Sequence, residues 1–471
     1  MDPTYMPLYE ALKRNIGQNP LSFHVPGHKY GKVFEKESHE RFQSILELDA
    51  TEVEGLDDLH APEGVIKEAQ QMASGFFKSD HTFFLVNGTT VGNMALILSV
   101  CGPGDEIIVQ RNCHKSVLNG LELSGASPVL ISPRYEKETG RHSHVSAEDV
   151  GQALKDHPGS KAVFLTYPDY FGRTYDLQKI AEVVHSFHIP LLVDEAHGVH
   201  FQLGNPFPQA ALTAGADGVA QSAHKMAPAM TMASFLHIQG DKVDLNRVHH
   251  YLQMLQSSSP SYPLMASLDV ARAYLASWKS KDKEDLFSFL EKVNSLFRSY
   301  NFWEVKSTDD PLKLTLEVLS GTGFDWSKAL DAVGIVPELA TTNQILLVFG
   351  LAPSVDLSLL EERLTTLDSQ LKKQTNHATI IEDQIQFPAV QKLEYSYSLM
   401  QRMDVERVNW QEAAGCVAAE AIIPYPPGIP LVMKGERLDQ PHIDQVHALL
   451  SQGARFQNTG MEQGVLVFKG E

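Results

Sequence analysis

The sequence predicts an α/β protein with a large domain built on a mostly parallel seven-stranded sheet. Short apolar runs alternate with segments of helical pattern between residues 80 and 240, which is typical of parallel strands joined by helices on both faces of a sheet. The runs are rich in Val, Ile, Leu and Phe, as expected of strands that are buried on both faces. The expected strands are residues 83–86, 106–109, 128–131, 162–166, 190–193, 218–221 and 234–238.

A chain of 471 residues is too long for one hydrophobic core, so several domains are expected. We expect an N-terminal arm over residues 1–50 and a large domain over 51–300. A small α/β domain would follow over 301–375, and a C-terminal domain over 376–471. The polar tract 372–377 marks a change of composition and would serve as the linker between the last two domains.

The composition argues against several classes of partner. The net charge is −19, with 39 Lys and Arg against 58 Asp and Glu, so the chain lacks the basic excess typical of nucleic-acid binding. Cys101, Cys113 and Cys416 have no metal-ligand spacing, which indicates a reducing compartment and no metal site. Neither a signal-peptide pattern nor an apolar run of membrane-spanning length is present. We therefore expect a cytoplasmic protein with no nucleic-acid or membrane partner.

A carboxylate and an amine follow two of the expected strands. Asp194 comes directly after strand 190–193, and Lys225 comes shortly after strand 218–221, at the strand ends where open α/β sheets bind ligands. The apolar, methionine-rich stretch 226–236 favours a lowered pKa of the Lys225 amine. A protein that uses pyridoxal phosphate (PLP) supplies a lysine that forms an imine and an aspartate that pairs with the pyridinium nitrogen. We therefore predict PLP as cofactor, with Lys225 and Asp194 as catalytic residues.

A glycine- and threonine-rich turn, NGTTVGN at 87–93, separates strand 83–86 from a helical segment. Free N–H groups at the start of a helix, together with hydroxyl groups, form an anion site. The turn matches neither a Walker A loop nor a dinucleotide fingerprint, and an ordinary capped helix is the alternative interpretation. The hydroxyl and imidazole just before Lys225 could also reach a phosphate. The expected phosphate ligands are Gly88, Thr89, Thr90, Ser222 and His224.

Three further residues lie just beyond or at strand ends. His114 follows strand 106–109 and could stack on the cofactor ring as well as take part in catalysis. Thr166 ends strand 162–166 and could donate a hydrogen bond to the phenolic oxygen of the ring. His197 lies three residues after Asp194 and could orient that aspartate or face the substrate. Each of these side chains could equally have a structural role.

Six motifs together resemble the Orn/Lys/Arg decarboxylase family, within the fold-type I PLP enzymes. The resemblance extends from about residue 5 to about 440 and is closest to the shorter bacterial form, which lacks a receiver-like N-terminal domain. It implies an aspartate aminotransferase type of fold and decarboxylation of arginine, lysine or ornithine to an amine in polyamine metabolism, with arginine ranked first. The motifs are FHVPGHK (23–29), GLDDLH (55–60), QRNCHKS (110–116), DEAHG (194–198), SAHK (222–225) and PYPPGIP (424–430).

The resemblance also implies a homodimer with shared active sites, or a larger homo-oligomer. By that resemblance Ser258 or Ser259 would approach the phosphate of the neighbouring subunit, and His28 would lie near the entrance of the active site. A basic substrate side chain needs a negative partner, since burying an unpaired cation is costly. Glu420 or Glu436 would supply that partner.

Two other kinds of function stay open. The same scaffold could catalyse transamination, aldol cleavage or β-elimination, although residues 300–350 contain no arginine to hold a substrate carboxylate. A non-catalytic PLP carrier or a polyamine-sensing regulator is the other alternative. The joint presence of lysine, aspartate and phosphate turn argues against a simple loss of function.

Overall fold

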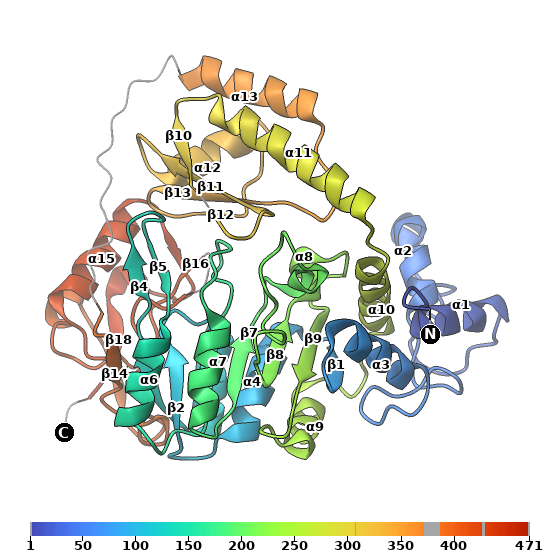
Figure 1. Ribbon diagram of the computed structural model, residues 1–471, viewed down its shortest axis with the longest axis horizontal. Coiled ribbons are helices and arrows are strands. Elements are labelled where there is room, and N and C mark those ends of the chain that lie inside the picture. The colour runs from blue at the N-terminus through green and yellow to red at the C-terminus, as the bar shows by residue number, and fades with distance from the viewer. Residues whose placement is uncertain (1, 307, 372–386, 426–428, 470–471) are drawn as a thin grey trace.

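The computed structural model describes residues 2–306, 308–371, 387–425 and 429–469 (Figure 1). The expected linker at 372–377 and the centre of the PYPPGIP motif lie outside the described residues. The centre of the molecule is one eight-stranded sheet, in which β8, β7, β6, β2 and β3 run parallel. Across the sheet the strands are β1 (His81–Leu85), β9 (Ser234–Ile238), β8 (Gly218–Gln221), β7 (Leu191–Asp194), β6 (Val163–Thr166), β2 (Glu106–Gln110), β3 (Ser127–Ile131) and β14 (Val390–Lys392).

The mostly parallel sheet is confirmed, but the expected number of seven strands is too small by one. The eighth strand, β14, pairs antiparallel with β3, and the backbone N–H of Ser132 also donates to the carbonyl of Ala389 at 3.0 Å. β14 has only three residues, two of them polar, so the sequence offers no apolar period that would indicate a strand. Main-chain hydrogen bonds to an otherwise open sheet edge define it instead.

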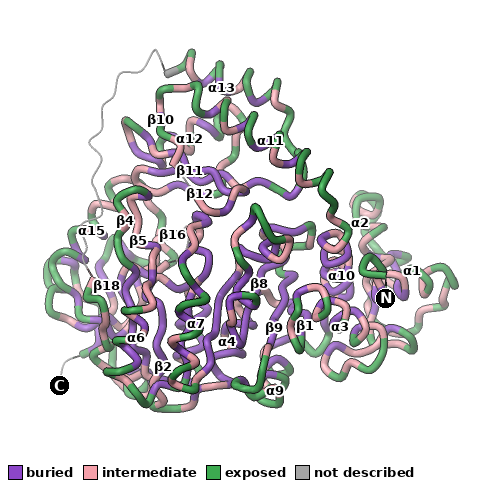
Figure 2. Tube along the Cα trace, viewed as in Figure 1, coloured by how far each residue is buried: buried purple, intermediate pink, exposed green. Residues whose placement is uncertain are grey.

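Both faces of the sheet are covered by helices, and alternate strand residues belong to different cores. In β2, Ile108 packs into one core while Ile107 and Val109 pack into the other. This period of two is what a strand buried on both faces requires, and Figure 2 shows the strands as the buried centre of the molecule. The first core includes α3 (Val65–Phe77), α6 (Ala147–Asp156), α7 (Leu177–Ser186) and α10 (Tyr262–Ala276), and the second includes α4 (Gly88–Val100), α5 (Lys115–Ser124) and α9 (Leu245–Leu255).

A second, antiparallel sheet with its own helices lies beyond one end of the large sheet (Figure 1). Its Leu314, Leu316 and Ile345 side chains join the first core of the large domain. The two sheets are therefore packed together rather than loosely tethered. The elements are α11 (Ser280–Arg298), β10 (Trp303–Lys306), β11 (Lys313–Val318), α12 (Gly323–Ala332), β12 (Leu339–Ala340), β13 (Gln344–Val348) and α13 (Leu357–Leu371).

The two ends of the chain form smaller units around this centre. The C-terminal unit has a core of its own, which includes Trp410, Val432 and Val465. The domain boundaries given above remain predictions. The remaining elements are α1 (Pro7–Gly17), α2 (Lys36–Leu48), β4 (Arg134–Glu136), β5 (Arg141–His144), η1 (Val199–Leu203), α8 (Ala223–Met226), α14 (Tyr397–Met400), β15 (Val405–Val408), η2 (Trp410–Glu412), β16 (Pro424–Tyr425), α15 (Gln440–Ser451), β17 (Arg455–Phe456), η3 (Met461–Gln463) and β18 (Val465–Phe468). In the part of the chain that the structure describes, no helix has the length and apolar character needed to cross a membrane.

Candidate active site

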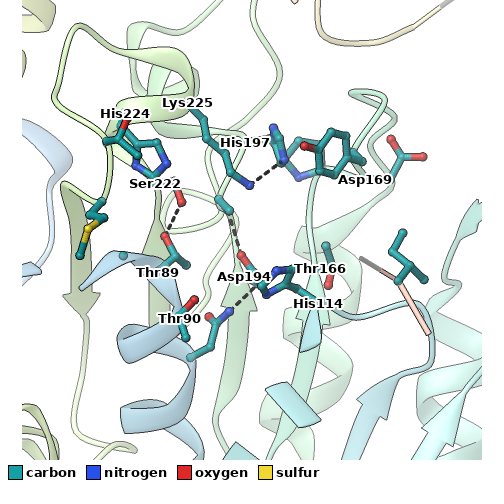
Figure 3. A pocket seen from close by; sticks show the side chains of 18 of the residues that line it. Thr89, Thr90, His114, Thr166, Asp169, Asp194, His197, Ser222, His224 and Lys225 are labelled. Carbon is teal, nitrogen blue, oxygen red and sulfur yellow. Dashed lines mark hydrogen bonds between the residues drawn. The ribbon is translucent and has the colours of Figure 1, made fainter. Parts of the chain in front are cut away.

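A cavity of about 300 Å³ lies at the carboxyl ends of β6, β7 and β8 (Figure 3). This is the edge at which parallel strands deliver the residues that follow them. Most of the side chains singled out in the sequence meet here, although they come from five separate segments. Those that line the cavity are Gly88, Thr89, Thr90, His114, Thr166, Asp194, His197, Ser222, His224 and Lys225.

Asp194 is the last residue of β7 and is only 3% exposed. Its Oδ2 accepts a hydrogen bond from the Asn93 amide at 2.8 Å, and its Oδ1 accepts from the Ala196 N–H at 3.1 Å. Both bonds hold the side chain in place, since each places a donor on one of its oxygens. The cavity therefore has an immobilised carboxyl group at the end of β7.

His114 caps the N-terminus of α5. Its Nδ1 accepts from the backbone N–H of Ser116 at 3.2 Å, which leaves the ring proton on Nε2. Burial lowers the pKa of His114, against the opposite effect of Asp194. The amide of Asn93, which holds Asp194, also donates to Ser116 Oγ at 2.9 Å. A neutral, flat ring is thus fixed on the cavity wall through the same network as the aspartate.

The first turn of α4 forms one end of the cavity. Gly88 begins the helix with φ +75°, a left-handed conformation that favours glycine. The Gly88 N–H donates to the Met232 carbonyl at 2.9 Å, so it is already paired. Thr89 and Thr90 follow in the first turn of the helix, where backbone N–H groups have no acceptor within the helix. The hydroxyls of Thr89 and Ser222 are 2.6 Å apart. N–H and hydroxyl donors therefore converge where an anion could bind.

Lys225 lies in α8, a single turn that follows β8. Its Nζ lies 3.0 Å from His197 Nε2 and 5.4 Å from the centre of the Tyr170 ring. Burial lowers the pKa of the Lys225 amine, and the charge of Asp194 opposes that shift. Lys225 and Asp194 thus face the same cavity from neighbouring strands, on one side of the sheet (Figure 3).

The structure adds residues that the sequence reasoning missed. Asn93, Asp169 and Tyr170 line the cavity. Lys313, the first residue of β11, reaches His197 Nδ1 at 3.1 Å. Asp169 and Tyr170 follow β6, so the strand-end signal applied to His114 could have found them. Lys313 carries no such signal, because it belongs to another sheet.

Three predicted residues are not among those lining this cavity. His28 lies in the arm, where its Nε2 contacts Asp49 at 3.0 Å. Ser258 lies in the segment between α9 and α10 and is exposed. These positions do not reach the cavity of their own chain, so any role of His28 or Ser258 there would involve another copy.

Glu420, the third of these, has its carboxylate engaged within the C-terminal unit. It accepts from the N–H of Leu466 at 3.0 Å and from the Asn458 amide at 2.9 Å. Glu436, considered as its substitute, is 2% exposed and forms a buried ion pair with Arg111 at 2.7 Å. Neither carboxylate is presented to the cavity described above.

Two buried polar atoms at the cavity have no hydrogen-bond partner among the described residues, namely the amide oxygen Oδ1 of Asn93 and the hydroxyl Oγ1 of Thr166. Buried polar atoms are nearly always satisfied, so such atoms indicate a missing polar ligand or water. In the same part of the chain, no three His, Cys, Asp or Glu side chains gather as a metal site would require. The cavity therefore fits a planar polar group with an anionic end and a carbon that accepts an amine.

Comparison with known proteins places the chain in a family. A family model described as Orn/Lys/Arg decarboxylase, major domain, matches residues 6–311, and a second, for the C-terminal domain, matches residues 378–461. The chain belongs to the Orn/Lys/Arg decarboxylase family. The resemblance seen in the sequence motifs is confirmed.

Individual relatives agree with this assignment. The uncharacterized protein YaaO of Bacillus subtilis (strain 168) is 44% identical over 454 residues, covering 94% of each chain. The arginine decarboxylase of the same strain is 36% identical over 462 residues, 95% of this chain and 94% of that protein. The crystal structure of the Francisella novicida lysine decarboxylase LdcF matches with a TM-score of 0.81 at 20% identity, over 98% of this chain and 81% of that one. This likeness confirms the predicted α/β fold class.

Proposed function

We propose that the protein is a PLP-dependent decarboxylase of a basic amino acid, with arginine as the first candidate. The observation that carries the proposal is the meeting of the Lys225 amine and the Asp194 carboxylate in one cavity at the strand ends. Family membership supports decarboxylation, and the 36% identical arginine decarboxylase ranks arginine before lysine and ornithine. The part in polyamine metabolism and the cytoplasmic location remain predictions.

In this proposal each cavity residue contacts a different part of the cofactor. Lys225 would bond to the aldehyde carbon, and Asp194 would pair with the ring nitrogen. The neutral ring of His114 would lie against the cofactor ring, and Thr166 would donate its unpaired hydroxyl to the phenolic oxygen. When bound, PLP supplies an electron sink for the bond that breaks at Cα. The proposed phosphate ligands are Gly88, Thr89, Thr90, Ser222 and His224.

The protein's own part is to fix charges and protons around that group. Asn93 and the Ala196 N–H hold the Asp194 side chain in place, so that it need not rearrange during the reaction. Burial favours the neutral, nucleophilic form of the Lys225 amine. His197 contacts that amine directly, so it can hold a proton next to the reacting centre.

A basic substrate also needs a carboxylate for its distal cation. We propose Asp169 and Glu338 for this part. Asp169 lines the cavity, and Glu338 accepts from the Tyr170 hydroxyl at 2.6 Å, beside the cavity wall. The charge of Glu338 also raises the pKa of the Lys225 and Lys313 amines, against the larger lowering effect of burial. Glu420 could serve only at a cavity other than that of its own chain.

We further propose a homodimer, or a larger homo-oligomer, in which the arm covers a second copy. The arm exposes Leu21, Phe23 and Val25, with Phe23 94% exposed. Adjacent exposed apolar side chains of this size indicate an interaction surface. In such a dimer Ser258 would approach the partner's phosphate and His28 the entrance of its cavity.

The proposal is tested by assaying CO₂ and amine release from arginine, lysine and ornithine. The unmodified protein should release both from at least one of the three, and Lys225→Ala should lose at least ~10³-fold of that rate together with the visible absorbance of bound cofactor. Lys161→Ala, at a lysine whose side chain is 51% exposed, is the matched control and should change neither. Absence of release from all three substrates would contradict the decarboxylase assignment, while retained absorbance with another product would favour a different PLP reaction.

A further inference from the structure

Three basic side chains at the cavity are connected by hydrogen-bond contacts between their nitrogen atoms. Lys225 Nζ lies 3.0 Å from His197 Nε2, and Lys313 Nζ lies 3.1 Å from His197 Nδ1. Lys225 and His197 line the cavity and come from the large sheet (Figure 3), whereas Lys313 comes from the small sheet. We call these three side chains the Lys–His–Lys chain.

The hydrogen-bonding capacity of imidazole limits the charge of this chain. A neutral imidazole has one N–H donor and one lone pair, while an ammonium group is a donor only. The ring N–H can therefore bond only to an amine that has lost its proton. An imidazolium, with two N–H donors, would need both lysines to be neutral. Every arrangement that keeps both contacts holds at most one positive charge.

Two of these arrangements differ in which lysine is the ammonium and in which ring nitrogen carries the proton. In the first, Lys225 is the ammonium and donates to Nε2, while Nδ1–H donates to the neutral amine of Lys313. In the second, Lys313 is the ammonium and donates to Nδ1, while Nε2–H donates to the neutral amine of Lys225. To pass from the first to the second, Nζ of Lys225 gives a proton to Nε2 as Nδ1 gives its own to Nζ of Lys313. The net charge is unchanged.

Burial lowers the pKa of both amines, so one shared proton can move between them. Burial lowers the pKa of the Lys313 amine to about 8; the charge of Lys225 adds to that shift, and the charges of Asp310, Glu338 and Asp169 oppose it. Burial also lowers the pKa of Lys225, and it lowers that of His197 so far that the ring is neutral. The groups that face Lys313 are Asp310, Glu338, Asp169, Lys225 and His197, and those that face Lys225 are Asp194, Glu338, His114 and His197.

Packing holds Lys313 against the imidazole. The residue is 3% exposed. A Cβ added at Gly172, where φ is +83°, would lie 2.7 Å from Lys313 Cγ, so the backbone of the large domain approaches the lysine closely. Asp310 Oδ1 lies 3.0 Å from His200 Nε2, and the charge of Asp310 raises the pKa of the Lys313 amine without a hydrogen bond between the two side chains. The imidazole of His197 is thus the hydrogen-bond partner of the Lys313 amine.

We propose that Lys313 is a positioning residue that takes up, through His197, the proton that Lys225 must lose before its amine can bond to a carbonyl carbon. The importance of that proton rests on the proposed function. The proton transfer itself involves only residues of this chain, so it can be measured without cofactor or substrate.

The test measures how readily the Lys225 amine reacts in the full-length chain after hydroxylamine has removed any bound carbonyl compound. The probe is formaldehyde with cyanoborohydride, which methylates neutral amines, and peptide mass spectrometry gives the rate at Lys225 from pH 6 to 10. In Lys313→Met the rate at pH 7 should fall about tenfold, and the pH midpoint should rise by about one unit. Lys306→Met, the same substitution elsewhere in the small sheet, should leave both unchanged.

A role of Lys313 in packing alone would leave the Lys225 midpoint where it is, and that result overturns the proposal. A purely through-space charge effect is separated by His197→Phe, in which a further Lys313→Met change should have no effect on Lys225. If Lys313→Met shifts the pH midpoint of Lys225 equally in the unmodified chain and in His197→Phe, the proposal is also overturned.

Should either variant fail to fold, ¹⁵N NMR of His197 in the unmodified chain decides the matter. The proposal requires that the Nε2–H tautomer is populated between pH 6 and 10, and a ring that carries its proton on Nδ1 throughout that range contradicts it. Because none of these measurements involves decarboxylation, they can succeed where the proposed function fails, and the reverse.

Discussion

Two buried histidines of the large domain differ in the partners of their ring nitrogens. In His237 on β9, Nδ1 lies 2.8 Å from Thr82 Oγ1 and Nε2 lies 3.0 Å from Gln221 Oε1, both uncharged groups. In His197 the two nitrogens face the amines of Lys225 and Lys313. The pKa of each imidazole is lowered, mainly by burial.

The comparison teaches that burial alone does not mark a functional group. His237 has partners that cannot exchange a proton with it near neutral pH, so its hydrogen bonds stabilise the fold. His197 has partners that can, and it touches a cavity at the strand ends. A perturbed pKa indicates function when the neighbouring groups also titrate in the same range.

The largest effect that separates the two histidines is expected from His197→Phe. Removing the imidazole breaks the Lys–His–Lys chain, so decarboxylation should slow about 10²-fold, the lower end of what a positioned proton donor or acceptor contributes. The free energy of unfolding should also fall, because the buried amine of Lys313 loses its hydrogen-bond partner. The rate is measured by CO₂ release and the free energy of unfolding by urea unfolding. A loss of stability without a loss of rate would show that His197 has only a structural role, like His237.

The converse substitution, His237→Leu, should reduce stability and leave the rate alone. It leaves the buried Gln221 Oε1 without its donor, while the Thr82 hydroxyl keeps its contact with Ser79 Oγ at 2.8 Å. An unsatisfied buried group costs about 1–3 kcal/mol. We expect a loss of about 2 kcal/mol in the free energy of unfolding, with CO₂ release within twofold of the unmodified protein. A large fall in the rate of the folded variant would show that the two histidines do not differ as described.

The last difference between the two histidines concerns pH. Burial lowers the pKa of His237 to about 3, from an ordinary value of 6.5. Between those values the unfolded chain binds a proton at this histidine and the native chain does not, so stability rises with pH across that window. The slope from this residue is at most about 1.4 kcal/mol per pH unit and vanishes above 6.5.

This pH dependence is measured by urea unfolding at pH 4.5, 5.5 and 7.5. The unmodified protein should lose more stability toward acid than His237→Leu does. Equal losses in the two proteins would mean that His237 is not buried in its neutral form.

The central sheet and the cavity at its edge could be predicted because their signals are local. Asp194 comes directly after an apolar run, and Lys225 comes shortly after another. In each case one short stretch of sequence indicates both a strand and the functional side chain at its carboxyl end. The parallel arrangement then brings separate strand ends to one cavity. The same logic extends to Thr166 and His114, which line that cavity as well.

The remainder depends on contacts between distant segments. Lys313 meets His197 only because the small sheet packs onto the large domain, and no spacing in the sequence encodes that meeting. β14 likewise exists because a short polar segment pairs with the edge of β3. Expectations for Ser258 and His28 concern a second copy of the chain and stay predictions.

The central claim is that the Lys225 amine bonds the cofactor, and one measurement tests it most directly. The full-length protein is loaded with PLP, reduced with borohydride, digested and analysed by peptide mass spectrometry. The account predicts a phosphopyridoxyl group on the peptide that contains Lys225. Its presence on Lys313 or another lysine instead, or its absence from every peptide, would contradict the account.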